Sequence, residues 1–201
     1  MKTCMKLLTT LVSVGLFVSG GTAAAQEALH PSKLESAFTG LTFGATKDQV
    51  ATWLRSHIAQ RFETEIEKTL DVREKDRLTR ERTALSEKAG TDRYAFDGTK
   101  TGWDVSVIQH DFGHNSAEEL IHEPEGKGHL YFFFVKDSLY KVVRTSGERP
   151  MSTVVAELQN AYGAPKTAEF LDPVAKDAIG SASWQSGLLS LSVEDRTKQY
   201  Q

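Results

Sequence analysis

His129-Leu-Tyr-Phe-Phe-Phe-Val135 is followed, after Lys136-Asp-Ser138, by Leu139-Tyr-Lys-Val-Val-Arg-Thr145. In the first run both alternating sets of side chains are apolar, which is typical of a central strand covered on both faces. A short polar link between two runs rich in aromatic and β-branched residues predicts a β-hairpin. We therefore expect the fold to be organised around an antiparallel sheet with this hairpin at its centre.

Downstream of the hairpin, the sequence predicts a helix and a second hairpin. From about Met151 to Tyr162, apolar residues recur at three- and four-residue spacing, and Gly163 is a natural helix cap. A strand then opens at Trp184 and turns at Ser186-Gly187. It returns with apolar and polar residues in alternation, which indicates an antiparallel pair with one solvated face.

Upstream, a first helix is predicted to begin at Thr46-Lys-Asp-Gln49, which fits a capping box. Residues of one apolar helical face follow it: Val50, Trp53, Leu54, His57 and Ile58. The next segment, 62–88, is rich in charge and has few apolar positions, which predicts one long charged helix, bent near Asp71-Val72. This helix either lies along the domain with one wet side or projects as a partner-binding arm; an uncovered apolar stripe would favour the arm.

Together these elements predict an α+β fold. An antiparallel sheet of about five to six strands packs against two short amphipathic helices, and one long charged helix covers about 62–88. Two of the strands are expected at 93–96 and 103–107. The stretch 110–127 is rich in Gly and polar residues and is expected to be irregular, with one turn of helix at 116–121.

The N-terminus has the pattern of a secretory signal peptide. Lys2 and Lys6 precede an apolar run at 7–18, and Ala23-Ala-Ala25 has the small residues that a signal peptidase accepts. The run is shorter than the ~20 residues that cross a bilayer, so an uncleaved membrane anchor is the less favoured alternative. No Cys stands at the cleavage point, so no lipid anchor is evident.

The expected organisation is therefore a cleaved signal peptide at 1–25, a flexible leader at 26–36, a single α+β domain at 37–195 and a frayed tail at 196–201. The segment 62–88 is a helical insertion in that domain. The mature protein is expected to be periplasmic or secreted, with no transmembrane segment.

Composition narrows the functional classes. The only cysteine, Cys4, lies in the signal peptide, so the mature chain has no disulfide and no thiol nucleophile. After loss of Lys2 and Lys6, 22 basic residues face 27 acidic ones. A mildly acidic chain lacks the concentrated basic surface that nucleic-acid binding needs.

Four residues are the best candidates for a metal site: His110, Asp111, His114 and His122. Imidazole and carboxylate are good ligands for zinc and similar ions. Their spacing matches no strong metal signature, so a solvated loop is the favoured interpretation and no cofactor is predicted.

The chain has no phosphate loop and no Gly-x-Ser-x-Gly elbow, so we predict that it is not an enzyme. The remaining hydrolase hypothesis uses His110 or His114 as base, with Asp111 orienting it.

Two stretches resemble known exported proteins. Gly44-Ala-Thr46-Lys-Asp-Gln-Val50-Ala-Thr-Trp-Leu54 resembles the Gly-Met-Thr-x-x-x-Val-x-x-x-Leu opening of small outer-membrane assembly lipoproteins, the BamE-like (SmpA/OmlA) family. Leu158-Gln-Asn-Ala-Tyr-Gly-Ala-Pro165, with a Trp strand after it, resembles the helix end of related exported α/β modules. The resemblance implies helices packed on an antiparallel sheet and protein binding during envelope assembly. Ala45 stands here in place of the usual Met.

The leading hypothesis is thus an exported, non-catalytic protein-binding or envelope-associated module, whose partner is another envelope or secreted protein. The alternative is a periplasmic metal- or small-ligand-binding protein that uses the 110–129 loop.

Overall fold

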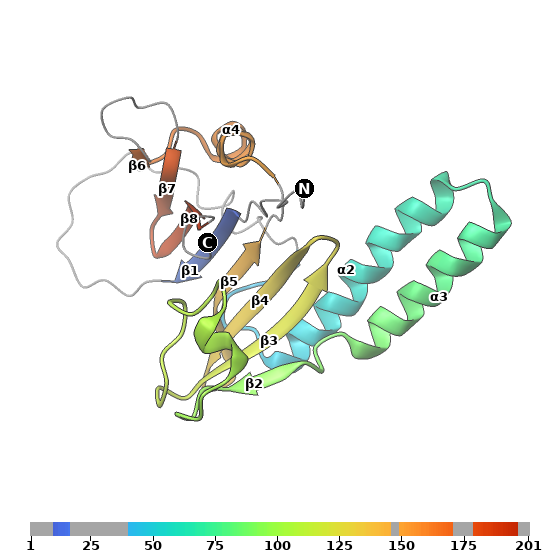
Figure 1. Cartoon of the computed structure of the whole chain (residues 1–201), viewed down its shortest axis with the longest axis horizontal. Coiled ribbons are helices and arrows are strands. Elements are labelled where there is room, and N and C mark those ends of the chain that lie inside the picture. Colours follow the sequence, from blue (N-terminus) through green and yellow to red (C-terminus); the bar gives the residue numbers. More distant parts are fainter. Residues whose placement is uncertain (1–9, 17–39, 146–148, 171–178, 197–201) are drawn as a thin grey trace, which may run out of the picture.

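The computed structural model describes residues 10–16, 40–145, 149–170 and 179–196, and it has an α+β fold (Figure 1). Its helices are α2 (Lys47–Lys68), α3 (Val72–Lys88) and α4 (Met151–Tyr162), with a short 3-10 helix η2 (Gly102–Val105). The expected leader 26–36 and most of the expected signal peptide and tail lie outside the described residues. Among the described helices, none combines the length and apolarity needed to cross a membrane.

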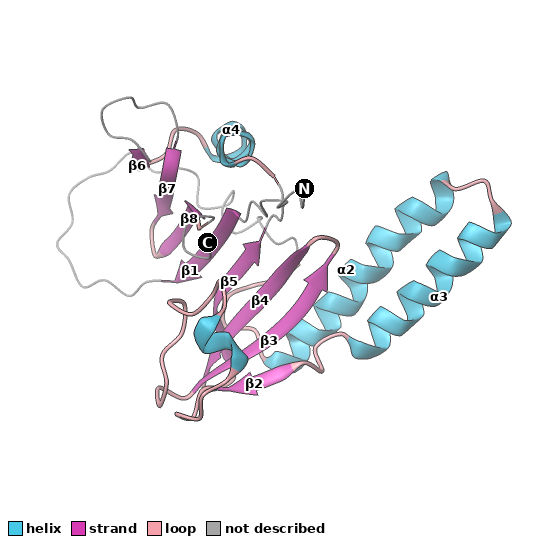
Figure 2. Ribbon diagram, viewed as in Figure 1, coloured by secondary structure: helices cyan, strands magenta, loops and turns pink. Residues whose placement is uncertain are grey.

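All described strands pair antiparallel, as predicted (Figure 2). A four-stranded sheet contains β2 (Arg93–Ala95), β3 (Glu118–Glu125), β4 (Gly128–Val135) and β5 (Ser138–Thr145). A three-stranded sheet contains β6 (Thr167–Phe170), β7 (Ile179–Ser186) and β8 (Leu189–Asp195).

The two sheets are joined by β1 (Thr10–Leu16), which lies between β5 and β8 and pairs antiparallel with both. The strand order is therefore β2-β3-β4-β5-β1-β8-β7-β6. With β1 the strands outnumber the five to six that were predicted, because β1, β3 and β6 were not expected as strands.

The β4 strand has an apolar core on each side, as its sequence predicts. On one face, Phe132 and Phe134 belong to a cluster with Val50 and Leu54 of α2. On the other face, Tyr131 and Phe133 pack with residues of the chain between β2 and β3. A third cluster joins α4 to β7 and β8, around the fully buried Trp184. Phe43 packs against both helix-bearing clusters, so α2 and α4 share one face of the sheet.

Several local predictions are confirmed. The Thr46 hydroxyl accepts from the Gln49 amide, and the Gln49 side chain accepts from the Thr46 amide, so the capping box is complete. The central hairpin turns at Lys136 and Asp137, which both have positive φ, at 51° and 63°. Two consecutive left-handed residues twist the turn in the sense that a two-residue hairpin requires.

The prediction of one long helix over 62–88 is wrong. The segment contains the end of α2 and the whole of α3, and the two helices run antiparallel as a hairpin that extends away from the sheet (Figures 1 and 2). The Thr69 amide bonds to the Ile66 carbonyl, and the Asp71 side chain accepts from the Arg73 amide as the N-cap of α3. Asp71 therefore begins a new helix where a bend had been expected, because a short polar side chain caps a helix well.

Two further predictions fail for local reasons. The expected strand at 103–107 is the 3-10 helix η2, because Thr101 and Asp104 form a capping box and leave Val105 exposed. The expected helical turn at 116–121 belongs to the strand β3. Leu120 and Ile121 bury themselves in the cores on opposite faces of the sheet, which only an extended backbone allows.

Candidate functional site

The four predicted metal ligands lie in different surroundings. His110 is exposed, with Gln109 Nε2 3.2 Å from its Nε2. Asp111 is buried and accepts from Lys141 Nζ at 2.6 Å and from Arg196 Nη1 at 2.7 Å. Both oxygens of the Asp111 carboxylate are thus occupied by cations of the chain itself, and Arg196, expected in a frayed tail, is buried.

His114 pairs with a different carboxylate. Its Nε2 lies 2.6 Å from Asp104 Oδ1, and the rings of Phe96 and Phe112 meet it edge-on. The hydrogen bond from His114 holds the pKa of Asp104 below its usual range. The Nδ1 atom of His114 is buried and has no hydrogen-bond partner among the described residues.

His122 lies in a chain of hydrogen bonds beside the central strand. Its Nδ1 is 2.7 Å from Asp92 Oδ2, and its Nε2 is 3.0 Å from His129 Nδ1. The ring of Tyr131 stacks on His122. Burial, and secondly the neighbouring His122, lowers the pKa of His129.

The predicted residues therefore do not converge. No group of three or more His, Cys, Asp and Glu suited to a metal ion occurs among the described parts of the chain. The hydrolase arrangement is also not formed there, because Asp111 faces Lys141 and Arg196 while His114 faces Asp104.

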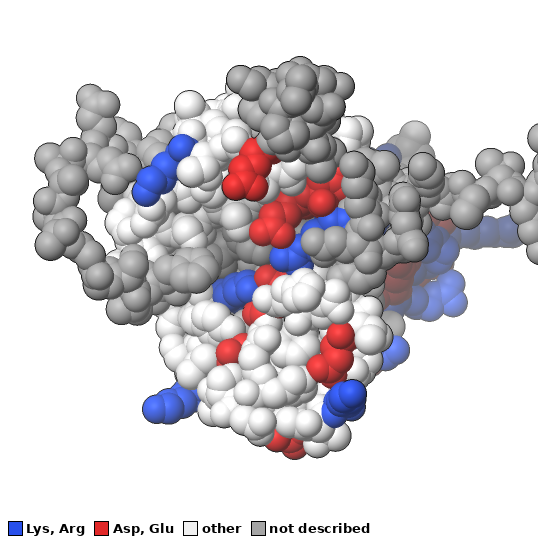
Figure 3. All heavy atoms as spheres, turned by 60° about the vertical axis from the view of Figure 1, so that its left-hand side comes forward, with Lys and Arg blue, Asp and Glu red and all other residues white. Residues whose placement is uncertain are grey.

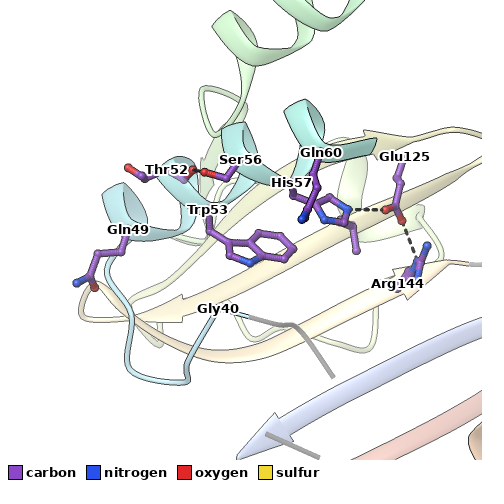
Figure 4. A pocket seen from close by; sticks show the side chains of 10 residues that line it. Gly40, Gln49, Thr52, Trp53, Ser56, His57, Gln60, Glu125 and Arg144 are labelled. Atoms are coloured by element: carbon purple, nitrogen blue, oxygen red, sulfur yellow. Dashed lines mark hydrogen bonds and ion pairs between the residues drawn. The ribbon is translucent and has the colours of Figure 1, made fainter. Parts of the chain in front are cut away.

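A cavity of about 660 Å³ lies elsewhere, between α2 and the sheet (Figure 4). One wall is a face of α2 that carries amides, hydroxyls and two aromatic rings, and the other wall comes from β3, β4 and β5. The lining residues are Gly40, Gln49, Thr52, Trp53, Ser56, His57, Gln60, Glu125, Leu130 and Arg144.

Glu125 is the electrostatic centre of this cavity. Its carboxylate lies 3.1 Å from His57 Nε2 and 2.8 Å from Arg144 Nε, as the dashed lines in Figure 4 mark. Burial disfavours the ionised carboxylate, but the hydrogen bond from His57 and the charges of Arg144 and Arg61 outweigh it. The pKa of Glu125 is therefore lowered.

Trp53 forms the aromatic part of the same wall. Its ring is stacked on His57, with centroids 4.8 Å apart and planes at 11°, and it meets Phe132 edge-on at 5.9 Å. The sequence places Trp53 and His57 four residues apart, which indicates one helical face but not whether that face is core or cavity. Glu125 and Arg144 have no sequence signal of their own, since only the register of β3, β4 and β5 brings them together.

The helical hairpin is the second surface of interest, and α2–α3 is called the arm below. Along its seam Leu78 is buried, and Ile66 and Leu85 are partly buried. At its tip Leu70 is 94% exposed and Val72 is 71% exposed. The apolar stripe is thus covered within the arm and left open at its end.

One group of charged side chains on the arm, centred on Arg77, forms ion pairs within α3. Arg77 bonds to Glu74 at 2.7 Å and to Glu81 at 2.7 Å, at helical spacings of three and four residues. Elsewhere on the molecule, Figure 3 shows acidic and basic side chains intermingled on one face, with no large area of a single sign.

No family model, no curated protein and no solved structure matches the chain.

Proposed function

We propose that this protein is an exported, non-catalytic protein-binding module of the periplasm or the secreted fraction, and that the arm is its contact surface. The observation that carries the proposal is the pair of apolar side chains, Leu70 and Val72, exposed at the tip of a projecting helical hairpin. Exposed apolar patches mark protein-interaction sites, and Leu70 and Val72 are the apolar residues that the tip offers to such a contact.

The construction of the arm supports this role. Leu78, Ile66 and Leu85 fill the seam between α2 and α3, so the hairpin has apolar packing of its own. The ion pairs of Arg77 give its outer surface both signs of charge. The partner expected for such a tip is a protein with a shallow apolar pocket and a polar rim of mixed charge.

The sequence pattern of the N-terminus supports export, and the likeness of 44–54 and 158–165 to envelope-assembly modules supports protein binding. In that role the partner is another envelope or secreted protein. The short amphipathic helix α4 and the first half of α2, packed on antiparallel strands, are the arrangement that the resemblance implies.

A photoreactive amino acid at position 70 tests the proposal in intact cells. We expect it to capture a distinct polypeptide, and we expect the capture to be lost when Val72 is also changed to Asp. The matched control is position 105, since Val105 is 77% exposed but lies away from the arm. Capture of the same polypeptides from positions 70 and 105, or no capture from position 70, contradicts the proposal.

Small-ligand binding is the second candidate function. The observation that favours it is the cavity at Glu125, which replaces the 110–129 loop as the proposed place of binding. Its volume of about 660 Å³ lies in the range of small-molecule sites, which hold roughly 300–1,000 Å³. Native mass spectrometry of the purified protein tests this candidate. A bound mass that disappears in Trp53→Ala supports it, and the bare mass of the chain in fresh preparations counts against it.

A further inference from the structure

The strand β1 lies at the centre of the sheet, although the sequence of residues 10–16 does not predict a strand there. Its residues 11–15 pair with β5, and its residues 10–16 pair with β8. It is the only described element that connects the four-stranded and three-stranded sheets by strand pairing. Yet the same residues lie in the apolar run of the expected signal peptide.

Export with cleavage after residue 25 removes β1 and leaves its place in the sheet open. β5 and β8 then face each other across the width of one strand, about 9.6 Å at the usual strand spacing. Each presents a row of backbone N–H and C=O groups without a ladder partner. Unpaired edges of this kind accept added strands readily.

The side chains that border this slot define what fits it. On the helix-bearing face, Val142 of β5 and Leu191 of β8 stand at the same level and are buried. On the opposite face, Val143 stands level with Ser192. At the middle of the slot a strand thus meets apolar neighbours on the helix-bearing face and the mixed pair Val143 and Ser192 on the other face. Charged residues of β5 and β8, such as Arg144 and Glu194, border other levels of the slot.

From Val12 to Leu16 the sequence of β1 alternates, with Val12, Val14 and Leu16 separated by Ser13 and Gly15, while Thr10 and Leu11 before them do not follow the pattern. It carries no charge. We propose that in the exported chain an extended segment of a partner protein takes the place of β1. The segment is about seven residues long, uncharged and alternating, and it runs antiparallel to both β5 and β8.

A second copy of this chain is a poor occupant on structural grounds. The outer strands of the described sheet are β2, with three residues, and β6, with four. Neither reaches the seven-residue length of β1. In the exported chain every other described strand keeps a neighbour on at least one edge, as β5 keeps β4 and β8 keeps β7, whereas a strand inserted in the slot needs both of its edges free.

The cavity described above adjoins the slot. Arg144 of β5 lines that cavity (Figure 4). The same residue is the register partner of Val12 of β1. A partner segment that pairs with β5 therefore passes beside the Trp53 and His57 wall. Residues of the partner protein that flank the paired segment can place a side chain in this cavity. Such a contact adds side-chain selectivity to the backbone pairing.

The inference rests on the proposed export, so the first measurement is the mass of the chain purified from the cells that export it. The second is amide hydrogen exchange on that material. We expect slot-facing amides of β5 and β8 to exchange at least about tenfold faster than those of β4, which keeps both neighbours. The probe is the peptide Thr-Leu-Val-Ser-Val-Gly-Leu with lysines added at both ends for solubility.

Added peptide is expected to slow exchange in β5 and β8 to the rate of β4. A control peptide with proline in place of its central Ser lacks a ladder donor and is expected to leave exchange fast. The proposal is overturned by retention of residues 10–16 in the purified chain. It is also overturned if β5 and β8 amides are already as protected as those of β4, or if the two peptides act alike.

A photoreactive amino acid at Ser192 identifies the natural occupant. Capture of another protein through an uncharged, alternating segment supports the proposal, whereas a crosslink within the chain or to a second copy overturns it. Position 70 reports on the arm separately. If a probe at position 192 captures a protein and a probe at position 70 captures none, the arm is not the contact surface, and the proposal for the slot is retained.

Discussion

The carboxylate of Asp111 accepts a hydrogen bond from the guanidinium of Arg196 at 2.7 Å, across 85 positions of sequence. Lys141 of β5 binds the other oxygen of the same carboxylate. One buried anion therefore ties the chain before β3 to the end of β8 and to the central hairpin.

Replacing Asp111 by Asn is expected to destabilise the protein strongly. The change leaves Arg196 and Lys141 without their anion, and loss of one partner from a buried ion pair costs about 3–5 kcal/mol. Urea unfolding measures the loss. Glu194→Gln is the control, because Glu194 also binds Arg196 but is 43% exposed, and such pairs contribute about 1 kcal/mol or less. Equal losses in the two variants would contradict the central role of Asp111.

Gly90 is expected to be irreplaceable for two separate reasons. Its φ is 72°, and a Cβ added there would lie 2.5 Å from the Cβ of Ala51 on α2. Gly126→Ala provides the comparison, since Gly126 has φ of 59° and open space around the added atom. Left-handed strain alone costs roughly 1–2 kcal/mol. Gly90→Ala adds overpacking of about 1–3 kcal/mol, so its urea midpoint should fall well below that of Gly126→Ala.

Glu123 and Glu125 are expected to have opposite effects on the pH dependence of stability. Burial raises the pKa of Glu123, so its contribution to stability is present below the ordinary carboxyl pKa and is lost as pH rises through the raised value. The pKa of Glu125 is lowered, so its contribution is present above the ordinary value and is lost as pH falls through the lowered one.

At pH 7, Glu123→Gln should therefore raise the free energy of unfolding, and Glu125→Gln should lower it. As pH falls, the difference for Glu123 should shrink first, because its carboxyl protonates at the higher pH, and the difference for Glu125 should persist to lower pH. Thermal melting from pH 3 to 8 checks both variants, and a shift of the same sign in the two would contradict the assignment.

Substitutions in the seam of the arm should lower stability, and substitutions at its tip should affect partner binding. Leu78→Ala empties a buried position and is expected to cost about 2–5 kcal/mol in urea unfolding. Leu70→Ser and Val72→Ser change exposed positions and should stay within about 0.5 kcal/mol of the parent chain. Partner capture from a photoreactive amino acid at position 70 should be lost in Val72→Ser although that variant remains folded, whereas Leu70→Ser reports on stability alone because the probe occupies its position.

Much of the fold could be predicted because its signals are local. The Thr46 box, the two-sided apolarity of β4 and the Gly163 cap each depend on a few neighbouring residues. The strand β3 could not be predicted in this way, since its Glu residues are compensated from elsewhere in the chain. Glu119 binds Lys47, Glu118 accepts from Tyr140, and Glu125 binds His57.

The candidate sites were less predictable than the fold. The His and Asp residues near 110–122 attract attention by type, but each finds a partner that the spacing does not reveal, such as Asp104 for His114. The cavity depends on Arg144 and Glu125 meeting through strand register. Strand register is set by the packing of whole sheet faces, so it cannot be predicted from a short sequence motif.

Each of the two sheets is built from an unbroken stretch of chain, β2 to β5 within 93–145 and β6 to β8 within 167–195. All strands of the first sheet are therefore synthesised before the second sheet begins, and folding of the first does not have to wait for the second. Joining the sheets by strand pairing requires a strand that belongs to neither stretch. The molecule is thus expected to mature in two stages, and the polypeptide that supplies the connecting strand decides when the second stage takes place.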